Sequence, residues 1–473
     1  MPIRQAQGTP SERRGVLSRR EFGRRLAAGL AGAAVAGPAL LAQEPGLPES
    51  GEPPLRCAPQ LVNTERLWDT LDELSGFGRL PGGGTSRLGF SPDDLAARQW
   101  LAGLLRREGL EVTVDAAANL RARRAGERDD LPTLWFGSHL DTVPNGGNFD
   151  GCVGSLGALE VIRTLNEKDV RTRRPLELIL FTNEEGVHYG KGLFGSRALA
   201  GLLDPGELEA VDDQGVALAE WVRRYGGDPE RIAEMTPPTG SLFAYLELHI
   251  EQGGVLWQRG IPLGIVEGIV GINRYRVTLE GFSNHAGTTP MNQRRDALVT
   301  ASKVILAVRE IVTAQAGRQV GTVGALSVQP GAPNVIPGRV EFPVELRDLS
   351  MDKIEELARQ IHDRAGQLAA ADGVALTWEL ASSHEPALTH PRIRFQIQQA
   401  AAEMRAVTLT MPSGAGHDAQ AMARLCPVGM IFVPSKDGIS HSPAEYSRPE
   451  EIACGAELLY RTILRLDALD KLS

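Results

Sequence analysis

The sequence predicts an α/β fold with a mostly parallel sheet, into which a smaller α+β module is inserted. The first observation behind this prediction is that short apolar runs alternate with a helical segment between Leu131 and Gly195, as in βαβ units with parallel strands. The second is that two later apolar runs of strand length each lead to a histidine. The third is that the order of elements changes to βαββαβ from about Gly271, which is typical of a ferredoxin-like module.

The composition limits the classes of function. The chain has 473 residues, of which 42% are hydrophobic and 23% are charged, as in soluble globular proteins of two to three domains. Its formal net charge is -9, and no basic block follows the N-terminal segment. This balance argues against nucleic acid or an anionic membrane as a partner, and a small-molecule substrate is expected.

The N-terminal segment, residues 1–42, resembles a twin-arginine signal peptide. The letters SRREF at 18–22 precede an Ala- and Gly-rich apolar run from Leu26 to Ala42, so export to or beyond the periplasm is expected. An amphipathic surface helix or a mitochondrion-like presequence is the alternative. The run is shorter than the roughly 20 residues that a membrane span needs, and Pro38 interrupts it. The Pro- and Glu-rich residues 43–55 are expected to form a linker.

The four cysteines, Cys57, Cys152, Cys426 and Cys454, show no CxxC spacing, so a zinc-thiolate site is not expected. They could be oxidised in an exported protein, but their spacing does not say which would pair. Cys152 lies two residues after Asp150. We expect it to pack rather than to act as a nucleophile, because no second feature supports a Cys/His pair.

Two helices are expected to cover the sheet. The first has Ser91 as its N-cap and Pro92 at its first position, and it stops at Gly109, all of which are typical helix signals. The second runs from Val153 to Leu165. Its start close after Asp150 would fix the loop that presents this carboxylate.

Four apolar runs of strand length lead to side chains that bind metals. The runs are 134–136, 176–181, 243–248 and 429–433. The side chains are His139, Asp141 and Asp150 after the first run, Glu184 and Glu185 after the second, His249 after the third and His441 after the fourth. A single His or Asp after a strand is usually a turn residue, but the carboxyl ends of parallel strands meet at one edge of a sheet. Imidazoles and carboxylates gathered there suit zinc, manganese, cobalt or nickel, and Asp141 could orient the His139 ring.

After His249 the pattern becomes that of the inserted module. Strands are expected at 275–279, 321–328, 339–347 and 374–380, and helices at 297–312 and 351–371. We place the module at residues 271–383, with the first domain at 56–270 and its second part at 384–473.

These motifs together resemble the hydantoinase/carbamoylase branch of the M20 metallohydrolases. The resemblance rests on HLDTVP, FDG, NEEG, LHIEQG, SNHAGTTPM, NVIPGR and GAGHDA, and it extends from about Arg56 to the C-terminus. The branch includes N-carbamoyl-L-amino acid hydrolases, allantoate amidohydrolases and β-ureidopropionases. The resemblance implies a metal-dependent exopeptidase-like catalytic domain, an inserted lid and dimerisation domain, and a homodimer.

The resemblance also assigns a metal centre. The implied ligands of two divalent ions per subunit are His139, Asp150, Glu185, His249 and His441, with Asp150 bridging. Two such ions, about 3.5 Å apart, need a shared carboxylate, and water between them is activated near neutral pH. Glu184 is then placed to accept the proton of that water and to pass it to the leaving nitrogen. The alternative is that Glu184 is the ligand and Glu185 is the base.

Residues for the substrate follow from the same resemblance. The implied substrate-binding residues are Gln252, Asn334, Arg347 and His417. His285 in the SNHAGTTPM loop is implied to stabilise the oxyanion, although a histidine in such a loop can also be simply exposed. Arg347 can grip a carboxylate with its planar guanidinium, or it can form a salt bridge with Glu345 or Asp348. His188 and Lys191 have no role dictated by the motifs and could tune substrate choice or face solvent.

The expected function is hydrolysis of the carbamoyl C–N bond of an N-carbamoyl-L-amino acid to the amino acid, CO2 and ammonia. An allantoate amidohydrolase and an M20-type dipeptidase are the alternatives among enzymes, and the preference over allantoate rests on the loop KGLFGSRALAG. An exported solute-binding or scaffold protein with a decayed metal site is the alternative from another class, but every ligand position is filled. The sequence does not identify the native metal, because this ligand set accepts several.

Overall fold

The computed structural model describes Cys57 and residues 61–472. The expected signal peptide (1–42) and the whole expected linker (43–55) lie outside the described residues, and both stay predictions. Of the helices that are described, none is long and apolar enough to cross a lipid bilayer.

A nine-stranded sheet forms the larger part of the fold. Its strands are β1 (Glu111–Val114), β2 (Leu120–Arg124), β3 (Thr133–Ser138), β4 (Leu176–Leu180), β5 (Leu242–Ile250), β6 (Leu263–Ile269), β12 (Ala387–Leu388), β13 (Thr408–Ser413) and β14 (Val428–Val433). They are ordered β1-β2-β4-β3-β5-β14-β6-β12, and β13 pairs with β6. The central strands β4, β3, β5 and β14 are parallel to one another, with antiparallel neighbours on both sides. The predicted α/β class with a mostly parallel central sheet is confirmed.

Helices cover both faces of this sheet. They are α2 (Thr64–Ser75), α3 (Pro92–Arg107), α4 (Cys152–Glu167), α5 (Phe194–Leu199), α6 (Leu218–Arg224), α7 (Val255–Arg259), α10 (Pro391–Glu403), α11 (Asp418–Met422) and α12 (Pro449–Asp467), with short 3-10 turns at Glu207–Glu209, Pro229–Glu234 and Lys436–Gly438. Along β3, Leu134 and Phe136 belong to a core shared with α2, α3, α4, α10 and α12. Trp135, between them, belongs to the core on the other face, with α7 and α11. Burial on both faces explains why the central strands read as continuous apolar runs.

The predicted helix after Ser91 forms with its expected ends. The Ser91 side chain accepts a hydrogen bond from the Asp94 amide, and Pro92 occupies the first turn. The helix ends at Arg107, before Gly109 with a φ of 83°.

The second predicted helix, α4, starts at Cys152, directly after the Asp150 loop. Gly151 between them has a φ of 65°. A Cβ at Gly151 would lie 2.3 Å from His139 Cε1, so only glycine lets this loop approach that histidine so closely.

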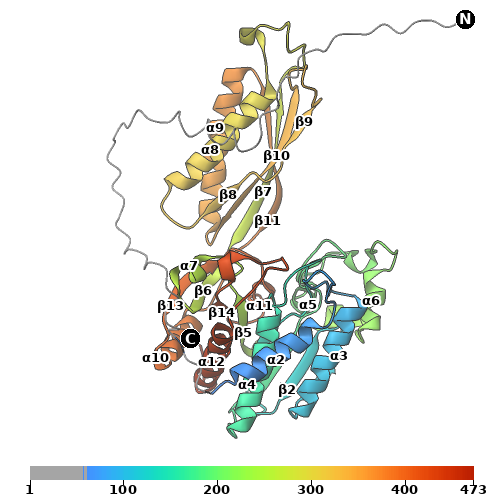
Figure 1. Cartoon of the computed structure of the whole chain (residues 1–473), viewed down its shortest axis with the longest axis vertical. Coiled ribbons are helices and arrows are strands. Elements are labelled where there is room, and N and C mark those ends of the chain that lie inside the picture. Colours follow the sequence, from blue (N-terminus) through green and yellow to red (C-terminus); the bar gives the residue numbers. More distant parts are fainter. Residues whose placement is uncertain (1–56, 58–60, 473) are drawn as a thin grey trace, which may run out of the picture. The chain divides into compact units, whose positions relative to one another are not determined.

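The inserted module is a five-stranded antiparallel sheet. Its elements are β7 (Gly271–Glu280), a 3-10 turn (Met291–Gln293), α8 (Ala297–Ala314), β8 (Val320–Thr322), β9 (Ser327–Gln329), β10 (Arg339–Asp348), α9 (Met351–Asp372) and β11 (Ala375–His384). The strands are ordered β11-β7-β10-β8, and β9 also pairs with β10. Helices α8 and α9 pack side by side on one face of this sheet and share its apolar core (Figure 1).

One predicted strand of the module was wrong. The run 321–328 was expected to be continuous, but it forms β8 and β9 with an interruption between them. Thr322 pairs with Glu345, and Ser327 pairs with Glu341. Ser327 is five positions after Thr322, whereas Glu341 and Glu345 on β10 are four positions apart. The extra residue breaks the hydrogen-bond ladder.

The described N-terminal residues are fixed to a helix of the larger part. Cys57 forms a disulfide with Cys454 in α12, 397 residues along the chain. The amides of residues 61–62 donate to the Glu457 carboxylate of the same helix, at 2.9 and 3.0 Å. The other two cysteines are buried and free, in keeping with a packing role for Cys152.

Candidate metal centre

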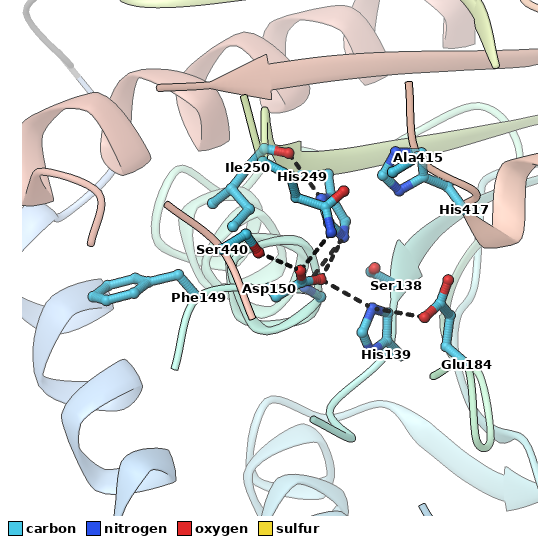
Figure 2. Close-up of polar contacts among 12 residues, drawn as sticks. Ser138, His139, Phe149, Asp150, Glu184, His249, Ile250, Ala415, His417 and Ser440 are labelled. Carbon is cyan, nitrogen blue, oxygen red and sulfur yellow. Dashed lines mark hydrogen bonds and ion pairs between the residues drawn. The ribbon is translucent and has the colours of Figure 1, made fainter. Parts of the chain in front are cut away.

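The side chains predicted to bind metal lie together at the carboxyl ends of the central strands. His139 follows β3, Glu184 and Glu185 follow β4, and His441 lies in the loop after β14. His249 was expected just after its strand, but β5 runs on to Ile250, because Phe432 and Val433 of β14 pair with the last two residues of β5. Figure 2 shows the Asp150 carboxylate between the imidazoles.

Asp150 belongs to two groups of three side chains that could each hold an ion. One group is His139, Asp150 and His249, and the other is Asp150, Glu185 and His441. Asp150 Oδ1 lies 3.2 Å from His249 Nε2 and 3.6 Å from His139 Nε2. Asp150 Oδ2 lies 3.3 Å from His441 Nε2. Each oxygen of one carboxylate therefore faces a different group.

The two buried imidazoles are oriented by backbone carbonyls. His139 Nδ1 lies 3.0 Å from the Asp141 carbonyl oxygen, and His249 Nδ1 lies 2.9 Å from the Ile250 carbonyl oxygen. A proton on each Nδ1 satisfies these contacts and leaves the Nε2 lone pair directed into the cluster. This is the arrangement that ligating histidines require.

Asp141 contacts backbone amides as well as the His139 ring that it was expected to orient. Its carboxylate oxygen is 3.6 Å from His139 Nδ1, farther than its own carbonyl oxygen. The same carboxylate accepts hydrogen bonds from the amides of Glu184 and Glu185, at 3.2 and 3.0 Å. Asp141 therefore fixes the backbone that presents both glutamates.

The two adjacent glutamates face different parts of the cluster. Glu184 Oε2 lies 3.6 Å from His139 Nε2, and Glu185 Oε1 lies 3.6 Å from His441 Nε2. Asn183 before them has a φ of 52°, a left-handed conformation that asparagine tolerates. Glu185, and not Glu184, belongs to one of the groups of described residues that could hold an ion.

The electrostatics of the cluster favour bound positive charge. Burial lowers the pKa of His139, but the carboxylates of Glu184, Asp141 and Asp150 outweigh burial and raise this pKa well above its ordinary value. The hydrogen bond with Asp150 raises the pKa of His441 to about 9.

The carboxyl groups respond to the same surroundings. Burial opposes ionisation of Asp150, but the neighbouring imidazoles hold its pKa well below the ordinary value. Burial, followed by repulsion from Asp150, raises the pKa of Glu185 to about 7. Burial also raises the pKa of Glu184 well above its ordinary value, against the attraction of His139.

The donor set fits divalent cations. His139 Nε2 and Glu185 Oε1 are buried and have no hydrogen-bond partner in the described part of the chain, which is costly unless a bound group satisfies each of them. Imidazole nitrogens and carboxylate oxygens are ligands that zinc, manganese, cobalt and nickel share. We therefore describe the cluster as a candidate metal centre.

Two of the predicted substrate-binding residues contact the cluster from inside the larger part. Gln252 Nε2 donates to Asp150 Oδ2 at 2.6 Å, while its Oε1 is buried without a partner among the described residues. His417 is buried, with Nε2 2.7 Å from Ser413 Oγ and its ring centroid 4.4 Å from that of His249 (Figure 2). In this conformation His417 supports His249, and its contact with substrate stays a prediction.

The other predicted substrate residues lie in the inserted module. His285 is exposed, and its Nδ1 accepts from the amides of Gly287 and Thr288. Asn334 lies beside the same loop, because its carbonyl accepts from the Ala286 amide. None of these hydrogen bonds reaches the metal centre, so the roles of His285 and Asn334 stay predictions.

Arg347 forms the salt bridge that was the alternative to carboxylate binding. Its guanidinium lies 2.7 Å from Glu345 Oε1 and donates to the Gly414 carbonyl at 2.5 Å. Lys191 pairs with Asp204 at an exposed position, which agrees with the solvent-facing alternative for this lysine.

Sequence reasoning missed two residues at the centre. Ser440 Oγ lies 2.9 Å from Asp150 Oδ2, and Glu445 accepts hydrogen bonds from backbone amides around Asp150 and His441. The available signal was an acidic residue four positions after His441, in a segment without charge between them.

Comparison with known proteins gives consistent relatives. Residues 135–465 match the model of peptidase family M20/M25/M40. An N-carbamoyl-L-amino acid amidohydrolase of Geobacillus stearothermophilus is 43% identical, over 86% of this chain and 99% of its own. A ureidoglycolate hydrolase of Arabidopsis thaliana is 35% identical, over 86% of this chain and 87% of its own. The crystal structure of a hydantoinase/carbamoylase family amidase from Burkholderia multivorans superposes with a TM-score of 0.82 at 36% identity, covering 86% of this chain and 98% of that one.

Proposed function

This chain belongs to peptidase family M20/M25/M40, and we propose that it hydrolyses the carbamoyl C–N bond of N-carbamoyl-L-amino acids. The observation that carries this proposal is the 43% identity with the Geobacillus amidohydrolase over nearly the whole of that protein. The centre around Asp150 supplies the groups that such a hydrolysis needs.

We propose that the centre holds two divalent ions. His139 and His249 would hold one ion, Glu185 and His441 would hold the other, and Asp150 would contribute one oxygen to each group. When bound, two such ions polarise the carbonyl of the substrate and lower the pKa of a water molecule.

Glu184 is the proposed general base and acid. Its carboxylate lies beside His139 Nε2 and outside the two ligand groups. It accepts a proton from water as the water oxygen bonds to the ureido carbon. It then delivers that proton to the departing nitrogen as the C–N bond breaks. The resulting carbamate breaks down, so one carbamoyl amino acid and one water give the amino acid, CO2 and ammonia.

The substrate carboxylate is proposed to bind Arg347. A guanidinium makes two parallel charge-assisted hydrogen bonds to a carboxylate, and Arg347 already holds one carboxylate, that of Glu345. Substrate binding therefore requires Arg347 to exchange at least one of its present partners. Gln252, Asn334 and His417 are proposed to complete the substrate site, and His285 to stabilise the oxyanion.

A ureidoglycolate or allantoate substrate is the second candidate. The 35% identity with the Arabidopsis ureidoglycolate hydrolase favours it, since that substrate also places a carboxylate beside a ureido group. The lower identity makes it second to the carbamoyl amino acids.

We propose that the protein is exported from the cytoplasm. The SRREF segment supports it, and so does the disulfide between Cys57 and Cys454, because structural disulfides persist chiefly in oxidising compartments. Replacing Arg19 and Arg20 by Lys should retain the precursor in the cytoplasm. Normal periplasmic accumulation of that variant would contradict the proposal.

A substrate screen tests the proposed function. The purified protein is supplied with manganese, cobalt, nickel or zinc and offered carbamoyl amino acids, allantoate, ureidoglycolate and dipeptides, while ammonia and amine release are read separately. Equal release of ammonia and amino acid from several carbamoyl amino acids is expected. Turnover of only allantoate or ureidoglycolate would favour the second candidate, and turnover of only dipeptides would contradict both.

A further inference from the structure

A buried glutamate outside the ligand set joins two loops of the metal centre. Glu445 lies between His441 and helix α12 and is 5% exposed. Its Oε1 accepts from the amides of Phe149 and Asp150, at 2.9 and 3.1 Å. Its Oε2 accepts from the His441 amide at 3.2 Å and lies 2.8 Å from Ser440 Oγ. One carboxylate thus accepts from three backbone amides and lies within hydrogen-bond distance of one hydroxyl.

These donors come from chain segments far apart in sequence. The Asp150 loop connects β3 to α4, and the His441 loop connects β14 to α12. Gly147 in the first loop leaves room for the glutamate, since a Cβ there would lie 2.2 Å from Glu445 Oε1. The fit of both loops around this side chain indicates that it sets their spacing.

The two halves of the centre depend on this spacing to different degrees. The His139 and His249 side chains are each 1% exposed, and each has its Nδ1 held by a carbonyl of its own segment. The His441 side chain is 48% exposed, and the backbone of His441 has a φ of 55°. Its backbone amide is held by Glu445.

Ser440 connects Glu445 to one oxygen of the Asp150 carboxylate. Its hydroxyl lies between Glu445 Oε2 and Asp150 Oδ2. Oδ2 is the oxygen that faces His441, whereas Oδ1 faces His139 and His249. Two of the contacts of Glu445 therefore lead to His441 and, through Ser440, to Asp150 Oδ2, the oxygen that faces His441.

We propose that Glu445 is a positioning residue that selectively stabilises ion binding in the half of the centre formed by Asp150, Glu185 and His441. The inference rests on the proposed two-ion centre. Glu445 contacts neither ion nor substrate; it acts through the loops that carry Asp150 and His441.

Metal titration of Glu445→Gln tests this role. Glutamine keeps one acceptor oxygen but places an amide nitrogen where the other loop needs an acceptor. Titration of the metal-free full chain with Mn2+, followed by calorimetry and electron paramagnetic resonance, should show two ions in the wild type with a spin-coupled signal. In the variant, the first ion should bind with unchanged affinity and the second about 10–100-fold more weakly. The coupled signal should give way to that of isolated Mn2+ at one equivalent.

Glu451→Gln is the matched control, because Glu451 is also a buried glutamate but lies in the first turn of α12. It should bind both ions as the wild type does. Ser440→Ala should weaken the second ion in the same direction and by less, and it keeps the test open if Glu445→Gln does not fold.

Three results would separate the proposals. Unchanged affinities for both ions in Glu445→Gln and Ser440→Ala would overturn the inference alone. Equal weakening of both ions would overturn its selectivity for one half. A wild-type protein that binds fewer than two ions would overturn the proposed two-ion centre, and this inference with it.

Discussion

The larger sheet and the inserted module present their functional side chains in different ways. In the larger sheet, His139, Asp150 and His249 are buried and already directed at one another. In the inserted module, His285 is exposed and Arg347 is bound to Glu345 and to a backbone carbonyl. The candidate metal centre is therefore preorganised, whereas Arg347 must exchange a partner to bind substrate as proposed.

Because of this difference, different measurements test the two regions. Substitutions at the candidate centre should change metal content or the chemical step, because the groups there are proposed to hold ions or to move protons. Substitutions in the module should change substrate binding and leave the metal content unchanged. A module variant that loses metal, or a variant of the centre that changes only substrate binding, would contradict this difference.

The largest effect is expected for Asp150→Ala. Removal of the carboxylate that both ligand groups share should release both ions and abolish activity. His249→Ala, which removes a ligand of one group only, should chiefly weaken one ion. Elemental analysis measures both outcomes, and two tightly held equivalents in Asp150→Ala would disprove the bridging role.

The next largest effect is expected for Glu184→Gln. The variant keeps the size of the side chain but cannot accept a proton, so turnover should fall by roughly 10²–10⁴-fold. Its metal content should stay near that of the wild type, because Glu184 lies outside the ligand groups. Lost metal would instead support the exchanged assignment, with Glu184 as ligand and Glu185 as base.

A smaller effect on the larger region is expected for Cys57→Ser. Loss of the disulfide to Cys454 should lower the free energy of unfolding by about 2–5 kcal/mol. Hydrogen exchange should rise in α12 and α2 and stay unchanged in α8 and α9 of the module. Cys426→Ser, at a buried free cysteine, is the control for the loss of a thiol. Equal unfolding of the wild type with and without reductant would show that the disulfide contributes nothing.

The smallest effect is expected for Arg347→Lys in the module. Lysine keeps the charge but loses the planar pair of donors, so substrate binding should weaken by about 1.5–3 kcal/mol. Metal content should not change. Arg276→Lys is the control, since Arg276 on β7 is exposed and pairs with Glu341 and Glu379. Equal binding constants for wild type and Arg347→Lys would remove this arginine from the substrate site.

The gathering of the candidate metal ligands could be predicted because its signal is local to each strand. An apolar run followed by His139, or by Glu184 and Glu185, predicts both the strand and the edge at which it ends. The end of β5 could not be placed as well, because pairing with β14 carries the strand past His249. Such pairing depends on a segment 183 residues away, since Phe432 pairs with His249, and it leaves no local signal.

Other features depend on contacts that the sequence does not encode locally. The pairing of Cys57 with Cys454 requires α12 to pack near the first described residues. Glu445 resembles any loop glutamate until the Asp150 loop folds against it. For Arg347 the sequence left two alternatives, carboxylate binding and a salt bridge, because a planar guanidinium suits both. The structure shows the salt bridge.

Anomalous X-ray scattering from crystals of the manganese- or zinc-loaded protein tests the central claim most directly. We expect two peaks on opposite sides of the Asp150 carboxylate, one in contact with His139 and His249 and the other with Glu185 and His441. A single peak, or two peaks that do not share Asp150, would contradict the account.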